Sequence, residues 1–224
     1  MNAPKGYRFF HVVAMLSVAT LLISNTIAVK IFSIGDFSFP AGIIVFPIDY
    51  ILGDILTEIY GYERNRSVIW VGFVALSIMV ICYVTAVKLP PVPFWHDQAA
   101  FQKLFNQTPR IALASFLAYL LGSFSNSYVL SKMKILTKGK YLWTRTIGST
   151  IVAEAFDSFV FNFVAFAGIF GLSDLFVVAL SGFVFKVLFE TLATPFTYLI
   201  VNKLKKAENE DKFDYNANYN PIKF

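Results

Sequence analysis

The chain alternates between long apolar runs and short polar segments. There are six apolar runs, and each approaches the roughly 20 residues with which an α-helix crosses a bilayer. The predicted spans are Phe10 to Ile31, Ala41 to Tyr60, Val68 to Leu89, Ile111 to Leu130, Ile147 to Phe170, and Leu175 to Val201. The pattern predicts an all-α polytopic membrane protein, a compact bundle of six transmembrane helices over residues 1–206. Residues 207–224 are polar and turn-rich, which predicts a poorly ordered C-terminal tail.

Composition supports the membrane assignment. Hydrophobic residues make up 57% of the chain and charged residues only 15%, against about 25% charged residues in soluble domains. The N-terminus resembles a signal peptide, but its apolar run continues to about Ile31 without a clear cleavage site, so we expect a first span instead. The long link between spans three and four contains the run AAFQKLF, for which we expect a short interfacial helix.

The formal net charge of +5 is explained by topology rather than by nucleic-acid binding. In a six-span arrangement most cations, among them Arg64 and Arg145, fall on one side of the membrane. Three fall on the other side: Lys88, Lys103 and Arg110. The positive-inside rule therefore predicts that both termini are cytoplasmic. We expect a multi-pass protein of the cell inner membrane.

Several polar residues lie inside the predicted spans, where a charged group costs several kcal/mol unless it is paired or hydrated. At about 100° per residue they form a polar stripe on each of four spans. The stripes include Tyr50 and Asp54 on span two, Tyr119 and Asn126 on span four, Glu154, Asp157 and Phe161 on span five, and Lys186 and Glu190 on span six. These stripes predict a polar cavity inside the bundle. Asp54 and Glu58 predict a water-accessible path that enters this cavity from the cytoplasmic half.

Some of these residues also have a purely structural explanation. Lys186 and Glu190, four positions apart, can neutralise each other. Glu58 can lie at the cytoplasmic interface beside Arg64, and Asn126 can serve only to join helices. Pro47 and Pro195 are typical of helix kinks. Glu154 and Asp157 are the hardest to explain in this way, because no cation is near them in the sequence.

The sequence does not indicate an enzyme. It contains no HExxH, Walker or GxSxG motif, so we expect no catalytic residues and no cofactor. The single cysteine, Cys82, excludes an intramolecular disulfide and a cysteine-based metal cluster. A purely structural membrane protein would not need so many buried acids, so transport of a small molecule is the leading interpretation.

Several strings together carry a family resemblance: SNTIAVKIFSIGDFSFPAGIIVFPIDYILGDILTEIYGYERNR, PPVPFW, QTPRIALASFLAYLLGSFSNSYVLSKMK and FKVLFETLATPFTYLIVNKLK. They resemble the queuosine precursor transporter family, which has also been grouped with vitamin uptake transporters. The resemblance runs from Asn25 to Lys206. It implies uptake of 7-deazaguanine bases, precursors of the modified tRNA base queuosine. It also implies a six-helix fold similar to the substrate-binding subunits of energy-coupling-factor vitamin transporters.

The chemistry of such a base suggests a binding site. A carboxylate accepts both N1–H and the exocyclic amine of a guanine-like edge, an amide or ammonium donates to O6, and an aromatic ring stacks on the base. A second carboxylate suits the cation of an aminomethyl precursor. The predicted substrate-binding residues are Asn25, Tyr50, Asp54, Tyr119, Asn126, Glu154, Asp157, Phe161, Lys186 and Glu190.

Energy coupling stays open at the level of sequence: a facilitator, a proton-coupled transporter and a subunit of an ATP-driven complex all fit. Span one has no Ala-x-x-x-Ala motif, which such subunits use to contact their transmembrane partner; its nearest series is Thr20, Ser24 and Ala28. We therefore expect a stand-alone transporter, with the vitamin-binding subunit as the alternative. An ATPase partner is not expected, and the sequence does not decide whether the protein forms a homo-oligomer or which deazapurine it prefers.

Overall fold

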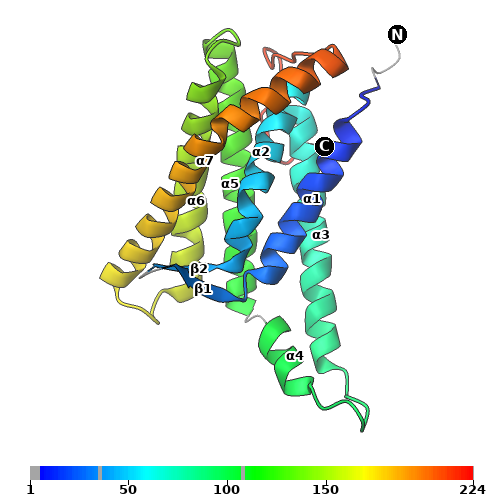
Figure 1. Cartoon of the computed structure of the whole chain (residues 1–224), viewed down its shortest axis with the longest axis vertical. Helices are drawn as coiled ribbons and strands as arrows, with labels where there is room; N and C mark the ends of the chain where they lie inside the picture. The colour runs from blue at the N-terminus through cyan, green and yellow to red at the C-terminus, as the bar shows by residue number, and fades with distance from the viewer. Residues whose placement is uncertain (1–5, 35–36, 107–108, 224) are drawn as a thin grey trace.

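The computed structural model describes residues 6–34, 37–106 and 109–223. Within them the chain forms a helical bundle with one β-hairpin (Figure 1). The order is α1 (Phe10–Ile27), β1 (Ile31–Ile34), β2 (Phe37–Pro40), η1 (Ala41–Ile44), α2 (Phe46–Ile55), η2 (Leu56–Tyr60), α3 (Tyr62–Lys88), α4 (Gln98–Phe105), α5 (Pro109–Leu136), α6 (Leu142–Phe166) and α7 (Leu172–Glu208). The predicted all-helical membrane bundle is confirmed.

Five stretches of the described chain are long and apolar enough to cross a membrane: α1, α3, the stretch from α4 through α5, α6 and α7. The predicted second span is different, because it is divided into the 3₁₀ turn η1, the ten-residue helix α2 and the π-helical turn η2. The predicted interfacial helix in the AAFQKLF run is present as α4. Which compartment each end of the bundle faces stays a prediction.

A two-stranded hairpin precedes the divided span, where the sequence analysis expected no strands. β1 pairs antiparallel with β2, in the register Phe32 opposite Phe39. In Figure 1 the hairpin lies at the same end of the bundle as α4 and as the turn between α6 and α7. The other end of the bundle holds the turn between α5 and α6, the C-terminal part of α7 and the tail.

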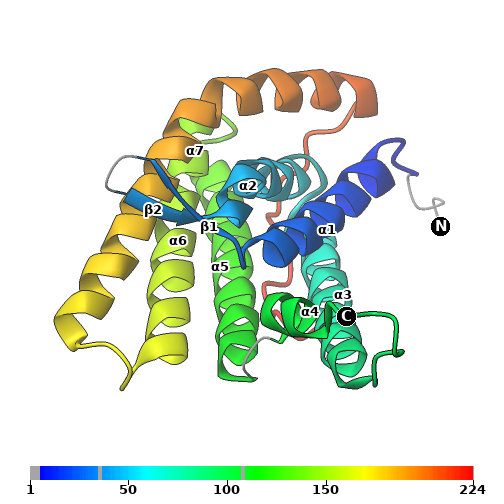
Figure 2. The same ribbon diagram turned by 60° about the horizontal axis from the view of Figure 1, so that its bottom comes forward.

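Helix α7 is the longest element, with 37 residues, and contains Pro195. Proline lacks a backbone N–H and clashes with the preceding turn, so it kinks a helix. Figure 2 shows the result: the first part of α7 packs along α6, and the last part turns to run across the end of the bundle. The kink predicted at Pro195 is thus present, and it brings the end of α7 over α2.

The C-terminal tail differs from the poorly ordered segment expected from its composition, because it packs against α3 and α5. Arg66 donates to the backbone oxygens of Asn218 and Asn220 at 2.7 and 2.8 Å. The ring of Tyr219 lies 4.9 Å from that of Tyr62. Trp70 donates to the backbone oxygen of Pro221 at 2.7 Å. The tail is thus held to the bundle by its backbone oxygens and by Tyr219, while many of its other residues stay exposed.

Asp214 is the most buried residue of the tail, with 5% of its surface exposed. Its carboxylate accepts hydrogen bonds from the backbone N–H of Tyr62 at 2.8 Å and from the Ser131 hydroxyl at 2.6 Å. Tyr62 is the first residue of α3, and the residue at its N-cap, Gly61, has φ +86° and no side chain to cap the helix. Asp214 therefore supplies from the far end of the chain the anionic cap that the local sequence lacks.

We predict that Asp214→Ala destabilises the protein by about 1–2 kcal/mol, the usual cost of losing a helix cap. Thermal unfolding in detergent, followed by loss of the monodisperse peak, measures the change. Asn216→Ala is the matched control, since Asn216 is exposed in the same tail. Equal melting temperatures for the two variants would show that the cap contributes nothing.

Candidate functional site

The middle of α6 carries an ion cluster that faces α7. Glu154 is fully buried and lies 12 residues from each end of α6, so it stands about 18 Å from either end of the helix. Lys186 of α7 places its Nζ 2.8 Å from Glu154 Oε2 and also pairs with Asp157. One cation thus joins the two acids for which the sequence offered no local partner.

A small cavity opens beside this cluster, between α2, α6 and α7. Its lining residues are Ile43, Tyr50, Thr150, Glu154, Phe185, Lys186, Phe189 and Glu190. Its volume is about 10 Å³, close to the space that a single water molecule occupies. The lining combines aromatic rings with ionisable groups, which is the composition expected of a site for a planar polar ligand. In this conformation the side chains that line the cavity leave no room for a heterocycle.

Glu190 is the acid of the cavity that no cation neutralises. It is 3% exposed, and among the described residues no lysine, arginine or histidine forms an ion pair with it. Its Oε1 atom has no hydrogen-bond partner within the described part of the chain. The mutual neutralisation of Lys186 and Glu190 that the sequence left open is therefore not present, because Lys186 pairs with the acids of α6 instead.

Asp54 and Asn126 form a second polar pair, between α2 and α5. Asn126 donates to Asp54 Oδ1 at 2.8 Å, and both residues are buried. The remaining oxygens, Asp54 Oδ2 and Asn126 Oδ1, lack a partner in the described residues. Asn126 thus joins two helices, which is the structural role open to it from sequence. The pair lies within electrostatic reach of Glu190.

The other three predicted residues lie away from the cavity lining. Asn25 donates to the backbone oxygen of Leu21 in its own helix at 2.8 Å. Tyr119 donates to the backbone oxygen of Ile69 at 3.1 Å and so joins α5 to α3. Phe161 packs edge-on against Phe166 near the end of α6.

Of the ten predicted residues, four line the cavity: Tyr50, Glu154, Lys186 and Glu190. Asp157 is adjacent to them through Lys186. Sequence reasoning did not assign Ile43, Thr150, Phe185 and Phe189 to the site, although all four line it. A signal was present for Thr150, which precedes Glu154 by one helical turn and so shares its face.

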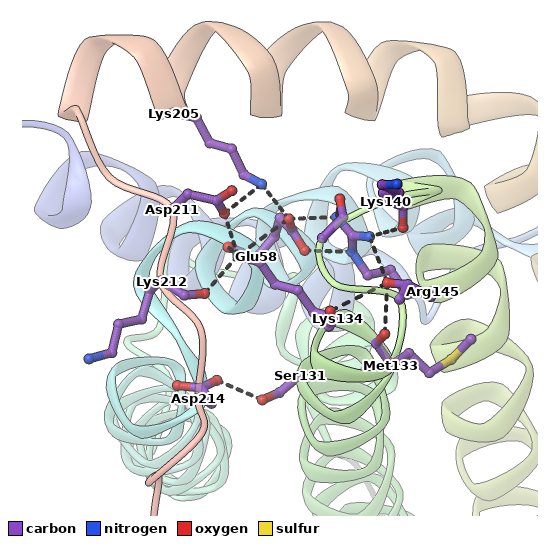
Figure 3. Close-up of polar contacts among 12 residues, drawn as sticks. Glu58, Ser131, Met133, Lys134, Lys140, Arg145, Lys205, Asp211, Lys212 and Asp214 are labelled. Atoms are coloured by element: carbon purple, nitrogen blue, oxygen red, sulfur yellow. Dashed lines mark hydrogen bonds and ion pairs between the residues drawn. The ribbon is translucent and has the colours of Figure 1, made fainter.

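A second ion cluster lies at the end of the bundle that carries the tail, and it surrounds Glu58 (Figure 3). Arg145 donates two hydrogen bonds of 2.8 Å to the Glu58 carboxylate. Lys205 Nζ lies 2.5 Å from Glu58 Oε1, and Lys134 Nζ lies 3.5 Å from the same atom. Glu58 is fully buried. The sequence left open a place for Glu58 beside Arg64; in the structure, three cations from α5, α6 and α7 contact it instead.

The tail closes this cluster through Asp211. Its carboxylate lies 2.6 Å from Lys134 and 2.7 Å from Lys205. Partial burial raises the pKa of Asp211, but the hydrogen bonds and charges of Lys134 and Lys205 outweigh burial and hold the pKa below its usual value. Asp211 is therefore an anion at neutral pH. With Glu58 sealed by these groups, the predicted water path through Glu58 is not open in this conformation.

The family comparison matches residues 40–200 to the model described as "Putative vitamin uptake transporter". The chain is 27% identical to the "Queuosine precursor transporter" of Escherichia coli over 97% of this chain and 98% of the relative. It is 27% identical to the "Probable queuosine precursor transporter" of Bacillus subtilis, over 87% and 85% of the two chains. A protein of the same name from Haemophilus influenzae is 29% identical over 70% of this chain and 67% of the relative. No solved structure matches the chain.

We predict that Glu58→Ala lowers the free energy of unfolding by about 3–5 kcal/mol, because it leaves the buried Arg145 without its carboxylate. Arg145→Ala should cost less, since Lys205 and Lys134 still lie within ion-pair distance of Glu58. The double variant should lose less than the sum of the single losses, since the partners are coupled. Melting curves in detergent test this, with Lys203→Ala, an exposed position of α7, as control. Strict additivity of the two losses would contradict the coupling.

Proposed function

We propose that this chain, which belongs to the vitamin uptake transporter family, imports queuosine precursors, 7-deazaguanine bases, into the cytoplasm. The proposal rests first on the three relatives, whose names specify transport of a queuosine precursor. It also rests on the closed cavity at mid-depth of α6, α7 and α2, whose lining combines acids, a lysine and aromatic rings. Transport rather than catalysis agrees with the family.

The bound base would replace some of the ion pairs within the Glu154–Lys186–Asp157 cluster by its own hydrogen bonds to these side chains. A carboxylate of α6 would accept N1–H and the exocyclic amine, which lie side by side on a guanine-like edge. The ammonium group of Lys186, released from one of its acids, would donate to the carbonyl oxygen O6. Phe185, Phe189 and Tyr50 line the cavity, and their rings offer the flat surfaces on which a base stacks. The ion cluster thus holds a hydrogen-bond acceptor and a hydrogen-bond donor close together, and the polar edge of the substrate needs both.

Binding requires the cavity to enlarge, because its volume of about 10 Å³ holds no heterocycle. The opening would separate α7 from α2 and α6, since these three helices provide the lining together with Ile43 of η1. A site near mid-depth that is closed by helix movement is the arrangement typical of alternating access. We take the described conformation, whose cavity has no room for the base, to be the narrowed state of that cycle.

We further propose that the chain works without an ATPase. The family name leaves open the alternative of a vitamin-binding subunit of an ATP-driven complex. Purified protein in liposomes distinguishes the two, because a stand-alone transporter takes up 7-cyano- or 7-aminomethyl-7-deazaguanine without ATP or a second protein. Uptake only when an ATPase partner is added would establish the alternative. Biotin and riboflavin serve as competing vitamins, and guanine as the related base.

We predict that Glu154→Gln and Asp157→Asn lower uptake by roughly 10- to 100-fold. This is the effect of losing a hydrogen bond to a charged group worth about 1.5–3 kcal/mol. Initial rates of radiolabelled uptake in liposomes give the change, with protein levels matched. Asp97→Asn is the control, because Asp97 is exposed at the start of α4. Wild-type rates in both α6 variants would remove these two acids from the site.

A further inference from the structure

Glu190 stands out among the ionisable groups because it faces the cavity without a compensating charge. It lies on α7 one turn after Lys186, is 3% exposed, and lines the cavity. Its Oε1 atom has no hydrogen-bond partner within the described residues. A carboxylate left charged in this position costs several kcal/mol, whereas a neutral carboxyl group costs far less.

The charges around Glu190 strengthen this argument. The cation of the cavity, Lys186, is already shared by Glu154 and Asp157. The carboxyl groups of Glu154 and Asp54 both lie within electrostatic reach of Glu190, so Glu190 has acidic groups rather than a free cation as neighbours. The ionisable and polar groups facing this region are Tyr50 and Asp54 from α2, Glu58 from η2, Asn126 from α5, Arg145, Thr150, Glu154 and Asp157 from α6, and Lys186 from α7. Arg145 is engaged by Glu58, so the group retains an excess of acids.

A proton is the cation that fits this place. The described residues contain no group of three or more histidine, cysteine or acidic side chains that would hold a metal ion. The cavity has room for about one water molecule, and a sodium or magnesium ion needs several oxygen ligands around it. Protonation neutralises Glu190 without demanding additional space.

We infer that Glu190 is the proton site of a proton-coupled transport cycle. The inference rests on the proposed function, which supplies the substrate. The protonated carboxyl donates its O–H to a carbonyl oxygen of the bound base, a contact that the carboxylate form cannot make. The proton enters with the substrate from the side of higher proton concentration and leaves Glu190 for water when the cavity opens to the other side. One proton therefore crosses with each substrate molecule.

The experiment uses the full chain in liposomes with the membrane voltage clamped by potassium and valinomycin. A gradient of one pH unit, acidic outside, should drive about tenfold accumulation of 7-cyano-7-deazaguanine by the wild type. With one proton carried per substrate molecule, the tenfold ratio of proton concentrations supports an equal ratio of substrate concentrations. Glu190→Gln keeps a neutral hydrogen-bond donor, so it should still exchange internal for external substrate. It should lose accumulation above the external concentration at every pH gradient. Asp174→Asn, an exposed acid on the same helix, should behave as wild type.

The outcomes separate this inference from the function itself. Wild-type uptake that does not depend on the pH gradient overturns the proton site but leaves the proposed import intact. A sodium gradient tested in parallel shows whether sodium drives the uptake instead. Gradient-driven accumulation by Glu190→Gln also overturns it. So does a folded Glu190→Gln protein that neither exchanges nor accumulates substrate, because exchange needs no change in protonation. Absence of any wild-type uptake or exchange contradicts the proposed function instead.

Discussion

The compensation of buried charge is the constraint on which the arrangement of this bundle depends. A helical membrane protein has little water at its centre, so every ionised side chain there needs a partner or a proton. The acids divide accordingly. Glu58 has three cations within ion-pair distance, Glu154 and Asp157 share one, and Glu190 has none among the described residues. The fully compensated acid holds the structure together, while Glu154 and Glu190 line the cavity.

This division explains why two carboxylates of the same stripe have different roles. Glu58 follows Asp54 by four residues, and both are buried. Glu58 lies at the level where α5, α6 and α7 bring Lys134, Arg145 and Lys205 together, so it becomes the centre of an ion network that fixes η2. Asp54 lies one turn deeper, where only the Asn126 amide meets it. Helical periodicity predicts the shared face but not the depth-dependent choice of partners.

The sequence therefore predicts those parts of the structure that depend on local pattern. Apolar runs give the long helices, and spacing on α6 and α7 places Glu154, Lys186 and Glu190 toward the interior. Partners far apart in the chain were not predictable in this way: Arg145 meets Glu58 across 87 positions, and Asp214 caps Tyr62 across 152. The tail shows the same limit, because its composition is typical of a solvated end, while its contacts depend on donors of α3 and α5 that only the folded bundle presents. The hairpin is a different case, because a local pattern was present and was not used: in the sequence, the dipeptide Gly-Asp separates two short runs rich in phenylalanine and isoleucine, IFSI and FSFP, and this pattern is typical of a two-residue hairpin.

Helix α7 connects the two ion clusters, and Pro195 lies between them. Lys186 and Glu190 precede the proline and face the cavity, whereas Lys205 follows it and contacts Glu58 and Asp211. A straight helix would transmit any movement at the cavity directly to the Glu58 network, whose buried pairs are costly to break. Because the helix bends at a proline, where a backbone hydrogen bond is missing, its two parts can change their relative direction at lower cost. We therefore expect the first part of α7 to move as the cavity opens while the second part stays anchored by Glu58 and the tail.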